Sequence, residues 1–321
     1  MLNWFPSAKS HEQSHVWTHF TGEKYVRALR ILPNINAKLR IFQFAFNSPF
    51  LAVLQSNLDP SKMAFRPKEF KVLGFDIYGT LIDWETGIYE GLLPLLSTLP
   101  PSDPHHPSNK SPSEIKAWIL SVYTQHELSI QKEDPTLPYP KVLETVYSRL
   151  ATQLCVPYSE NEAQEFGASI GTWPAFPDTV AAMKTLAKHY KLIVLSNVDR
   201  TSFSRTLSGP LQNTPFSAIY TAQDIGSYKP DVRNFEYLIE NARKEFGAEK
   251  EEILVVAQSL IHDHVPAKKV GLKPSVWIRR GNPAMGGTID DLKDEANLVA
   301  TFGTLGELAE AVETAFKEGG V

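Results

Sequence analysis

Short apolar runs alternate with longer segments of helical periodicity over the second half of the chain, and one such run precedes them. The runs, each typical of a buried strand, are residues 72–75, 192–195, 218–220, 253–256 and 274–278, the last of which we expect to be the final core strand. The helical segments are residues 178–190, 205–211, 234–246, 263–270 and 305–316. This alternation predicts an α/β fold with a doubly wound parallel-sheet (Rossmann-like) core.

Between the first and second apolar runs the pattern is helical only. The expected helices are residues 84–99, 114–131, 140–154 and 160–170. Ser113 is a candidate N-cap for the second of them. The Pro- and Ser-rich residues 100–112 cannot form a helix, and we expect His105 and His106 within them to be solvated loop residues. An all-helical domain is therefore predicted at residues 84–175, inserted into a core built from residues 63–83 and 176–321.

Residues 1–62 are basic, whereas the rest of the chain is acidic, and prolines break them into short pieces. We expect an N-terminal extension that is loosely docked or disordered, a targeting segment, or sequence upstream of a true start at Met63. The string from His11 to His15 matches the H-E-x-x-H zinc pattern, and His19 continues its spacing. Such a site needs a sizeable domain around its helix, so we expect a chance match.

Composition narrows the class of protein. The 321 residues are 42% hydrophobic and 21% charged with a net charge of −4, which is ordinary for a globular protein and unlike a nucleic-acid binder. Cys155 is the single cysteine, so we expect no internal disulfide, a cytoplasmic location and a small buried helix residue at this position. No apolar run is long enough to predict a membrane span.

Polar residues follow the predicted strands at places where the chain is otherwise apolar. Asp76 comes directly after the first run, and Ser196 and Asn197 follow the second. Lys229 lies in the turn after the third run, and Asp263 comes shortly after the fourth. Because ligands of open α/β sheets bind at the carboxyl ends of the strands, these residues are candidates for one site, which we expect to take a small-molecule substrate.

The stretch Phe75-Asp76-x-Tyr78-Gly79-Thr80-Leu81 resembles the first motif of the haloacid dehalogenase superfamily. Together with Ser196, Lys229 and Asp263, the resemblance covers about residues 70–320. It points to the L-2-haloacid dehalogenase branch, because phosphatase members carry a second Asp where Tyr78 stands. In this family the helical insertion is a cap domain that closes over the site, and related dehalogenases are typically homodimers.

The resemblance implies a role for each motif residue. Asp76 would be the nucleophile that forms an aspartyl ester, with Thr80 fixing its rotamer and Lys229 supplying the compensating charge. Asp263 would position or deprotonate the water that cleaves the ester. The expected reaction is hydrolysis of a small (S)-2-haloacid to a 2-hydroxy acid.

Substrate contacts follow from the same resemblance. Ser196 and the amides of the first loop, at Ile77 and Tyr78, would hold the substrate carboxylate. Asn197 would lie near the departing halide. These residues complete the set of expected site residues.

Departures from the family pattern leave alternatives open. Gln258 stands where a first metal-binding carboxylate is usual, so we expect no metal or other cofactor, although Mg²⁺ would be needed if the protein were a phosphatase. Residues 122–127 offer no arginine at the start of the cap, and Phe235 and Leu260 replace an expected Tyr and Asn. The alternatives are a Mg²⁺-dependent phosphatase and a non-catalytic accessory protein on the same scaffold.

His262 and His264 flank Asp263, and we expect ordinary packing or hydrogen bonding from them rather than metal binding.

Overall fold

The computed structural model describes residues 65–134, 137–281, 292 and 295–318. The chain divides into two units, Met1–Lys62 and Met63–Val321, and the described residues belong to the second. The H-E-x-x-H string and the rest of the N-terminal extension lie outside the described residues. Within the described ranges, no helix combines the length and the apolar character needed to cross a bilayer.

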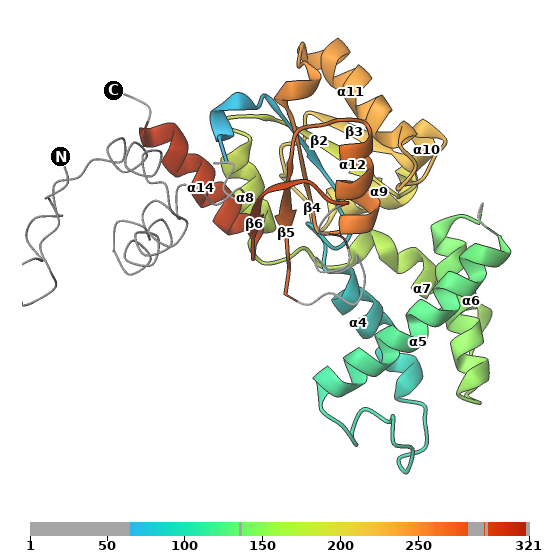
Figure 1. The fold of residues 1–321 in the computed structure, drawn as a ribbon. Helices are drawn as coiled ribbons and strands as arrows, with labels where there is room; N and C mark the ends of the chain where they lie inside the picture. The colour runs from blue at the N-terminus through green and yellow to red at the C-terminus, as the bar shows by residue number, and fades with distance from the viewer. Residues whose placement is uncertain (1–64, 135–136, 282–291, 293–294, 319–321) are drawn as a thin grey trace, which may run out of the picture. The chain divides into compact units, whose positions relative to one another are not determined.

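A parallel sheet of six strands forms the core, in the order β3-β2-β1-β4-β5-β6 (Figure 1). The strands are β1 (Val72–Phe75), β2 (Lys191–Ser196), β3 (Ala218–Thr221), β4 (Ile253–Ala257), β5 (Ser275–Ile278) and β6 (Leu298–Phe302). β1 pairs with β2 on one side and with β4 on the other, so the strand order reverses beside it. Such a switch point leaves a crevice at the carboxyl ends of the strands.

Strand β6 corrects the prediction that residues 274–278 form the last strand. It pairs in parallel with β5 at the edge of the sheet, and its residues are half-buried or exposed. A central parallel strand is covered on both faces and is therefore a continuous apolar run, whereas an edge strand is not. The prediction of a doubly wound α/β core is confirmed.

Helices cover both faces of the sheet, and the side chains of β1 alternate between them. Leu73 and Phe75 belong to an apolar cluster with α8 (Thr179–Leu186) and α14 (Leu305–Glu318). Val72 belongs to a second cluster with α11 (Arg233–Phe246) and α12 (Val265–Lys269). Gly74 has no side chain because α11 approaches closely: a Cβ there would lie 2.9 Å from Leu238 Cδ2.

Two short helices complete the core. They are α9 (Arg200–Ser208) and α10 (Ala222–Ile225). The helix expected at residues 205–211 is α9. It begins earlier, at Arg200, because Asp199 caps it by accepting the backbone N–H of Ser202.

The insertion after β1 is helical, as expected, and comprises α4 (Trp84–Leu96), α5 (Pro112–Glu133), α6 (Tyr139–Gln153) and α7 (Glu160–Ala168). Ser111, not Ser113, is the N-cap of α5, and it forms a capping box with Glu114. The helix starts two residues earlier than expected, because Pro112, at its first position, has no N–H to satisfy. A bridge between Ile82 and Ala175 brings the chain back to the core.

Two loop residues differ from the expectations. Cys155 is exposed with a φ of 54°, because α6 has ended before it and the chain turns through the left-handed region there. The ring of His105 is half-buried and stacks on Trp118 of α5, with ring centroids 3.8 Å apart. The proline-rich turns fold back onto that helix, which local sequence pattern does not reveal.

Candidate active site

Asp76 is the first residue after β1 and lies at the switch point of the sheet. The loop that follows turns sharply at Gly79, whose φ is 96° and whose missing Cβ would lie 3.3 Å from the Trp84 ring nitrogen. This turn brings Thr80 back toward Asp76, and the Thr80 hydroxyl donates to Asp76 Oδ2 at 2.7 Å. The same hydroxyl accepts the backbone N–H of Gln258 at 2.9 Å, so the carboxylate is held by a fixed donor.

Lys229 places a buried ammonium between two carboxylates. Its Nζ lies 2.8 Å from Asp76 Oδ1, 2.7 Å from Asp263 Oδ1 and 2.9 Å from the carbonyl oxygen of Leu195. The lysine side chain is only 2% exposed. All of its ammonium protons are therefore engaged within the protein, which leaves none for a substrate.

Asn197 holds this lysine in place through its backbone. Its Nδ2 donates to the carbonyl of Lys229 at 2.9 Å, and its Oδ1 accepts the N–H of Lys229 at 2.7 Å. A side chain that pairs with a distant backbone segment gives no local sequence signal, so the sequence did not reveal this role. Asn197 also lines the cavity, and its amide nitrogen carries a second N–H, so the expected contact near the halide stays a prediction.

Burial and neighbouring charges together shift the pKa values of this network. Burial lowers the pKa of Lys229, but the neighbouring charges of Asp263 and Asp76 outweigh it, and the net effect raises the pKa. Burial raises the pKa of Asp263 to about 7, although the charge of Lys229 opposes the shift. Asp263 Oδ2 accepts no hydrogen bond from the described residues, so this carboxyl keeps one oxygen available for a water.

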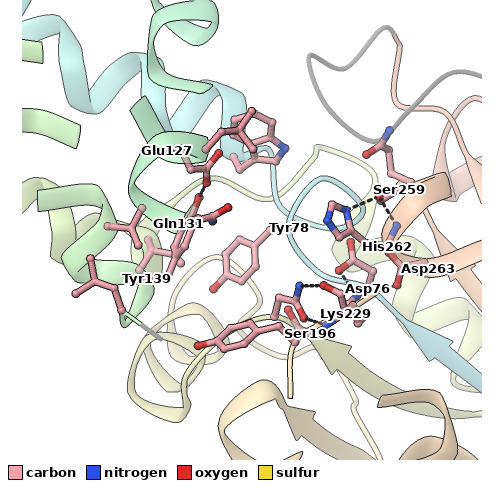
Figure 2. Close-up of a pocket in the computed structure, with 18 of the residues that line it drawn as sticks. Asp76, Tyr78, Glu127, Gln131, Tyr139, Ser196, Lys229, Ser259, His262 and Asp263 are labelled. Atoms are coloured by element: carbon pink, nitrogen blue, oxygen red, sulfur yellow. Dashed lines mark hydrogen bonds and ion pairs between the residues drawn. The ribbon is translucent and has the colours of Figure 1, made fainter. Parts of the chain in front are cut away.

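A cavity of about 430 Å³ opens over Asp76, between the strand ends and the cap helices (Figure 2). Its polar lining from the core comprises Asp76, Tyr78, Ser196, Asn197, Tyr228, Lys229, Gln258, Ser259, His262 and Asp263. Ser196 Oγ is buried and has no partner among the described residues. The structure thus brings seven of the eight sequence-predicted residues to this cavity or its immediate support: Asp76, Tyr78, Thr80, Ser196, Asn197, Lys229 and Asp263.

Ile77 is the predicted residue whose side chain does not reach the cavity. It is fully buried in the apolar core, and its carbonyl accepts the N–H groups of Thr80, Leu81 and Ile82. Only its backbone amide remains available for the expected substrate contact. Successive side chains of an extended chain point to opposite sides, and Phe75 and Ile77, on either side of Asp76, both belong to the same apolar cluster.

Tyr78 stands where a second acid would be needed for phosphate chemistry. Its hydroxyl lies 2.9 Å from Thr206 Oγ1, and its ring packs edge-on against Trp173. Burial raises the pKa of Tyr78 well above its ordinary value, so the phenol stays protonated. The side chain shapes the cavity and supplies no carboxylate.

The two histidines beside Asp263 diverge, as expected. His262 lines the cavity and lies next to Asp76 in Figure 2, with its Nδ1 3.0 Å from Ser259 Oγ. Burial and the charge of Lys229 lower its pKa. His264 points the other way, into the interior, where its Nδ1 lies 2.6 Å from Ser275 Oγ and burial lowers its pKa to about 4.

The side chains at the cavity floor offer few of the oxygen ligands that a divalent cation commonly uses. Mg²⁺ takes oxygen ligands in an octahedron, commonly including carboxylates. Here the carboxylates of Asp76 and Asp263 both contact the ammonium of Lys229. Gln258, at the position where the family pattern has a carboxylate, offers a neutral amide instead. Among the described residues, no group of three or more His, Cys, Asp and Glu side chains could hold a metal ion.

Three cap residues were not predicted from the sequence: Glu127 and Tyr139, which line the cavity, and Tyr123, which is buried beside them. The hydroxyls of Tyr123 and Tyr139 both donate to Glu127 Oε1, at 3.2 and 2.5 Å. Tyr123 and Glu127 share one face of α5 because they are four residues apart, and α6 supplies Tyr139. Tyr123 and Glu127 fall in the stretch in which no arginine was found, and the described cavity lining contains no arginine either.

Comparison with known proteins gives the family. The model of the haloacid dehalogenase-like hydrolases matches residues 70–260, which is more than half of the chain. The protein therefore belongs to the haloacid dehalogenase-like hydrolases. No curated protein matches it.

Solved structures share the fold at low identity. The L-2-haloacid dehalogenase PA0810 is 20% identical with a TM-score of 0.60 over 76% of this chain and 99% of its own. The L-2-haloacid dehalogenase of Xanthobacter autotrophicus, solved with chloropropionic acid covalently bound, is 15% identical with a TM-score of 0.56 over 76% and 98%. The hydrolase YfnB of Bacillus subtilis, solved with magnesium, is 18% identical with a TM-score of 0.57 over 76% and 98%.

Proposed function

We propose that this hydrolase releases halide from a 2-haloacid through an ester on Asp76. The observation that carries the proposal is the buried network in which Lys229 joins Asp76 to Asp263, while Tyr78 occupies the place of a second acid. A halide leaves without a proton, so a site of this kind needs no acid beside its nucleophile. An alkoxide leaving a phosphate does need one.

In the first step, a carboxylate oxygen of Asp76 attacks C2 of the substrate, and the bonding electrons of the carbon–halogen bond leave with the halide. Lys229 and Thr80 each contact one oxygen of the Asp76 carboxylate and so fix its orientation. A nucleophile held in the reactive orientation loses less entropy when it attacks. Ser196 Oγ and the backbone amides of the Asp76 loop would bind the substrate carboxylate.

In the second step, water adds to the carbonyl carbon of the Asp76 ester. Asp263, whose Oδ2 has no partner within the described part of the chain, takes the proton from that water. Collapse of the intermediate releases the 2-hydroxy acid and restores the Asp76 carboxylate, and the proton later passes to solvent. The ammonium of Lys229 contacts both carboxyl groups and stabilises the negative charge that moves between them.

The test compares halide release from 2-chloropropionate with phosphate release from an aryl phosphate, each with Mg²⁺ and with chelator. We expect halide release that resists the chelator and is abolished by Asp76→Asn. Phosphate release that needs Mg²⁺, without halide release, would instead establish the phosphatase. If neither activity is found and Asp76→Asn binds ligands like the wild type, the accessory-protein alternative holds.

A further inference from the structure

The cap wall of the cavity carries a buried acid that the proposed chemistry does not use. Glu127 is only 4% exposed and lines the cavity from α5. Figure 2 shows it with Tyr139 and Gln131 on the cap side, across the cavity from Asp76 and Lys229 and beyond Tyr78. A carboxyl group in such a place has lost its water and needs hydrogen-bond donors instead.

The donors around Glu127 satisfy only one of its oxygens. Tyr139 donates to Oε1 at 2.5 Å, and the Tyr123 hydroxyl lies 3.2 Å from Oε1 and 2.7 Å from the Tyr139 oxygen. Each tyrosine has a single hydroxyl proton, so both are consumed within the cluster. Oε2 is buried and has no partner among the described residues. With Glu127 ionised, the cluster therefore lacks a donor at Oε2 and has none to offer a ligand.

The charge of this wall points to the kind of donor that is missing. Glu127 and Asp134 are the charged residues of the cap among the described lining, and both are acidic. The lining has one lysine, Lys229, whose ammonium is already bound by Asp76, Asp263 and the Leu195 carbonyl. Burial raises the pKa of Glu127 against the effect of its tyrosine hydrogen bonds, as expected for an acid without enough compensation.

The size of the cavity agrees with a second binding region. Its volume of about 430 Å³ falls in the range of sites that hold ligands much larger than a three-carbon acid. A substrate whose carboxyl end lies near Ser196 and whose reacting carbon lies over Asp76 would extend toward α5 with the rest of its chain.

We propose that Glu127, with Tyr123 and Tyr139, forms a subsite for a protonated amine at the end of the substrate remote from the reacting carbon. The enzyme's substrate would then be an ω-amino 2-haloacid rather than a simple haloalkanoic acid. This inference rests on the proposed function for the placement of the reacting carbon. The amine would donate to Glu127 Oε2 and supply the charge that this wall lacks.

The test measures binding of acids that carry no halogen, so its outcome does not depend on turnover. Calorimetry would compare ω-amino acids of increasing length, from 4-aminobutanoate to 6-aminohexanoate, with the acids in which a methyl group replaces the ammonium. We expect the best-fitting amino acid to bind at least about tenfold more tightly than its methyl partner, the strength of a hydrogen bond to a charged group.

Variants locate the preference. Glu127→Gln keeps an acceptor for the tyrosines but places an NH₂ donor at the position of Oε2. The ratio of the affinities for the amino acid and its methyl partner should therefore fall to near one. Glu133→Gln makes the same change on an exposed face of α5 and should leave this affinity ratio unchanged.

Three results would overturn the proposal: no preference for the amine at any length in the wild type, a preference unchanged in Glu127→Gln, or tighter binding of the matching ω-hydroxy acid. The wild-type comparison stands even if Glu127→Gln does not fold. Absence of halide release, with the amine preference present, would count against the Asp76 chemistry alone.

Discussion

Replacement of Lys229 by methionine tests the buried network most sharply. The side chain is 2% exposed, and its Nζ contacts Asp76, Asp263 and the Leu195 carbonyl at 2.8, 2.7 and 2.9 Å. Methionine fills a similar volume but leaves two carboxyl groups facing each other without a cation. Removing one partner of a buried ion pair costs about 3–5 kcal/mol, and we expect a loss of about 4 kcal/mol in the free energy of unfolding at pH 8.

The loss should depend on pH with a definite sign. Without the ammonium, the pKa values of the two carboxyl groups rise in the folded state, while unfolded Asp titrates near ~3.9. The folded variant then binds protons that the unfolded chain does not, so its stability falls as pH rises. The wild type also carries one raised carboxyl pKa, that of Asp263 at about 7. The gap between the two proteins should therefore widen from about pH 5 to about pH 8.

Urea unfolding followed by tryptophan fluorescence at both pH values measures this gap. Lys191→Met is the matched control, because Lys191 begins β2 and is exposed, and it should change stability by less than about 0.5 kcal/mol. Halide release should be lost in Lys229→Met and kept in the control. A Lys229 variant that loses less than about 1 kcal/mol at pH 8, or whose deficit shrinks as pH rises, would refute the proposed network.

Three further outcomes follow from the site and its support. Turnover should rise with pH through about 7, where Asp263 ionises to become the base, and a pH profile that is flat from about 5 to 9 would contradict that role. Thr80→Val should lower turnover and cost about 1–3 kcal/mol in stability, because it removes the hydroxyl that donates to Asp76 and accepts the N–H of Gln258. Thr80→Ser should restore both quantities in the same assays. Gly87→Ala should destabilise by about 1–3 kcal/mol in thermal unfolding, because a Cβ there would lie 2.2 Å from the Trp173 ring; an unchanged melting temperature would contradict this packing.

The central fold could be predicted because its strands are covered on both faces. Such strands are continuous apolar runs, so β1, β2 and β4 stand out in the sequence. The edge strand β6 mixes half-buried and exposed residues and was therefore missed. The start of α5 was misplaced by two residues because Ser111 and Ser113 both suit an N-cap, and only the backbone geometry decides between them.

The core half of the site could also be predicted, whereas its cap half could not. Parallel strands deliver their final residues to one edge of the sheet, which is why Asp76 and Asp263 come together from distant positions. The cap wall depends on how α5 and α6 pack against each other. Glu127 is one of many polar residues on a long amphipathic helix, and its spacing of four from Tyr123 is the only local sign of its role.

The most direct test of the ester on Asp76 is turnover in heavy-oxygen water with the enzyme in excess over 2-chloropropionate. If water attacks the carbonyl of an Asp76 ester, the first label should appear in the peptide that contains Asp76, and the hydroxy acid of the first turnover should be unlabelled. Label in the first hydroxy acid, with none on Asp76, would show that water attacks the substrate directly and would contradict the account.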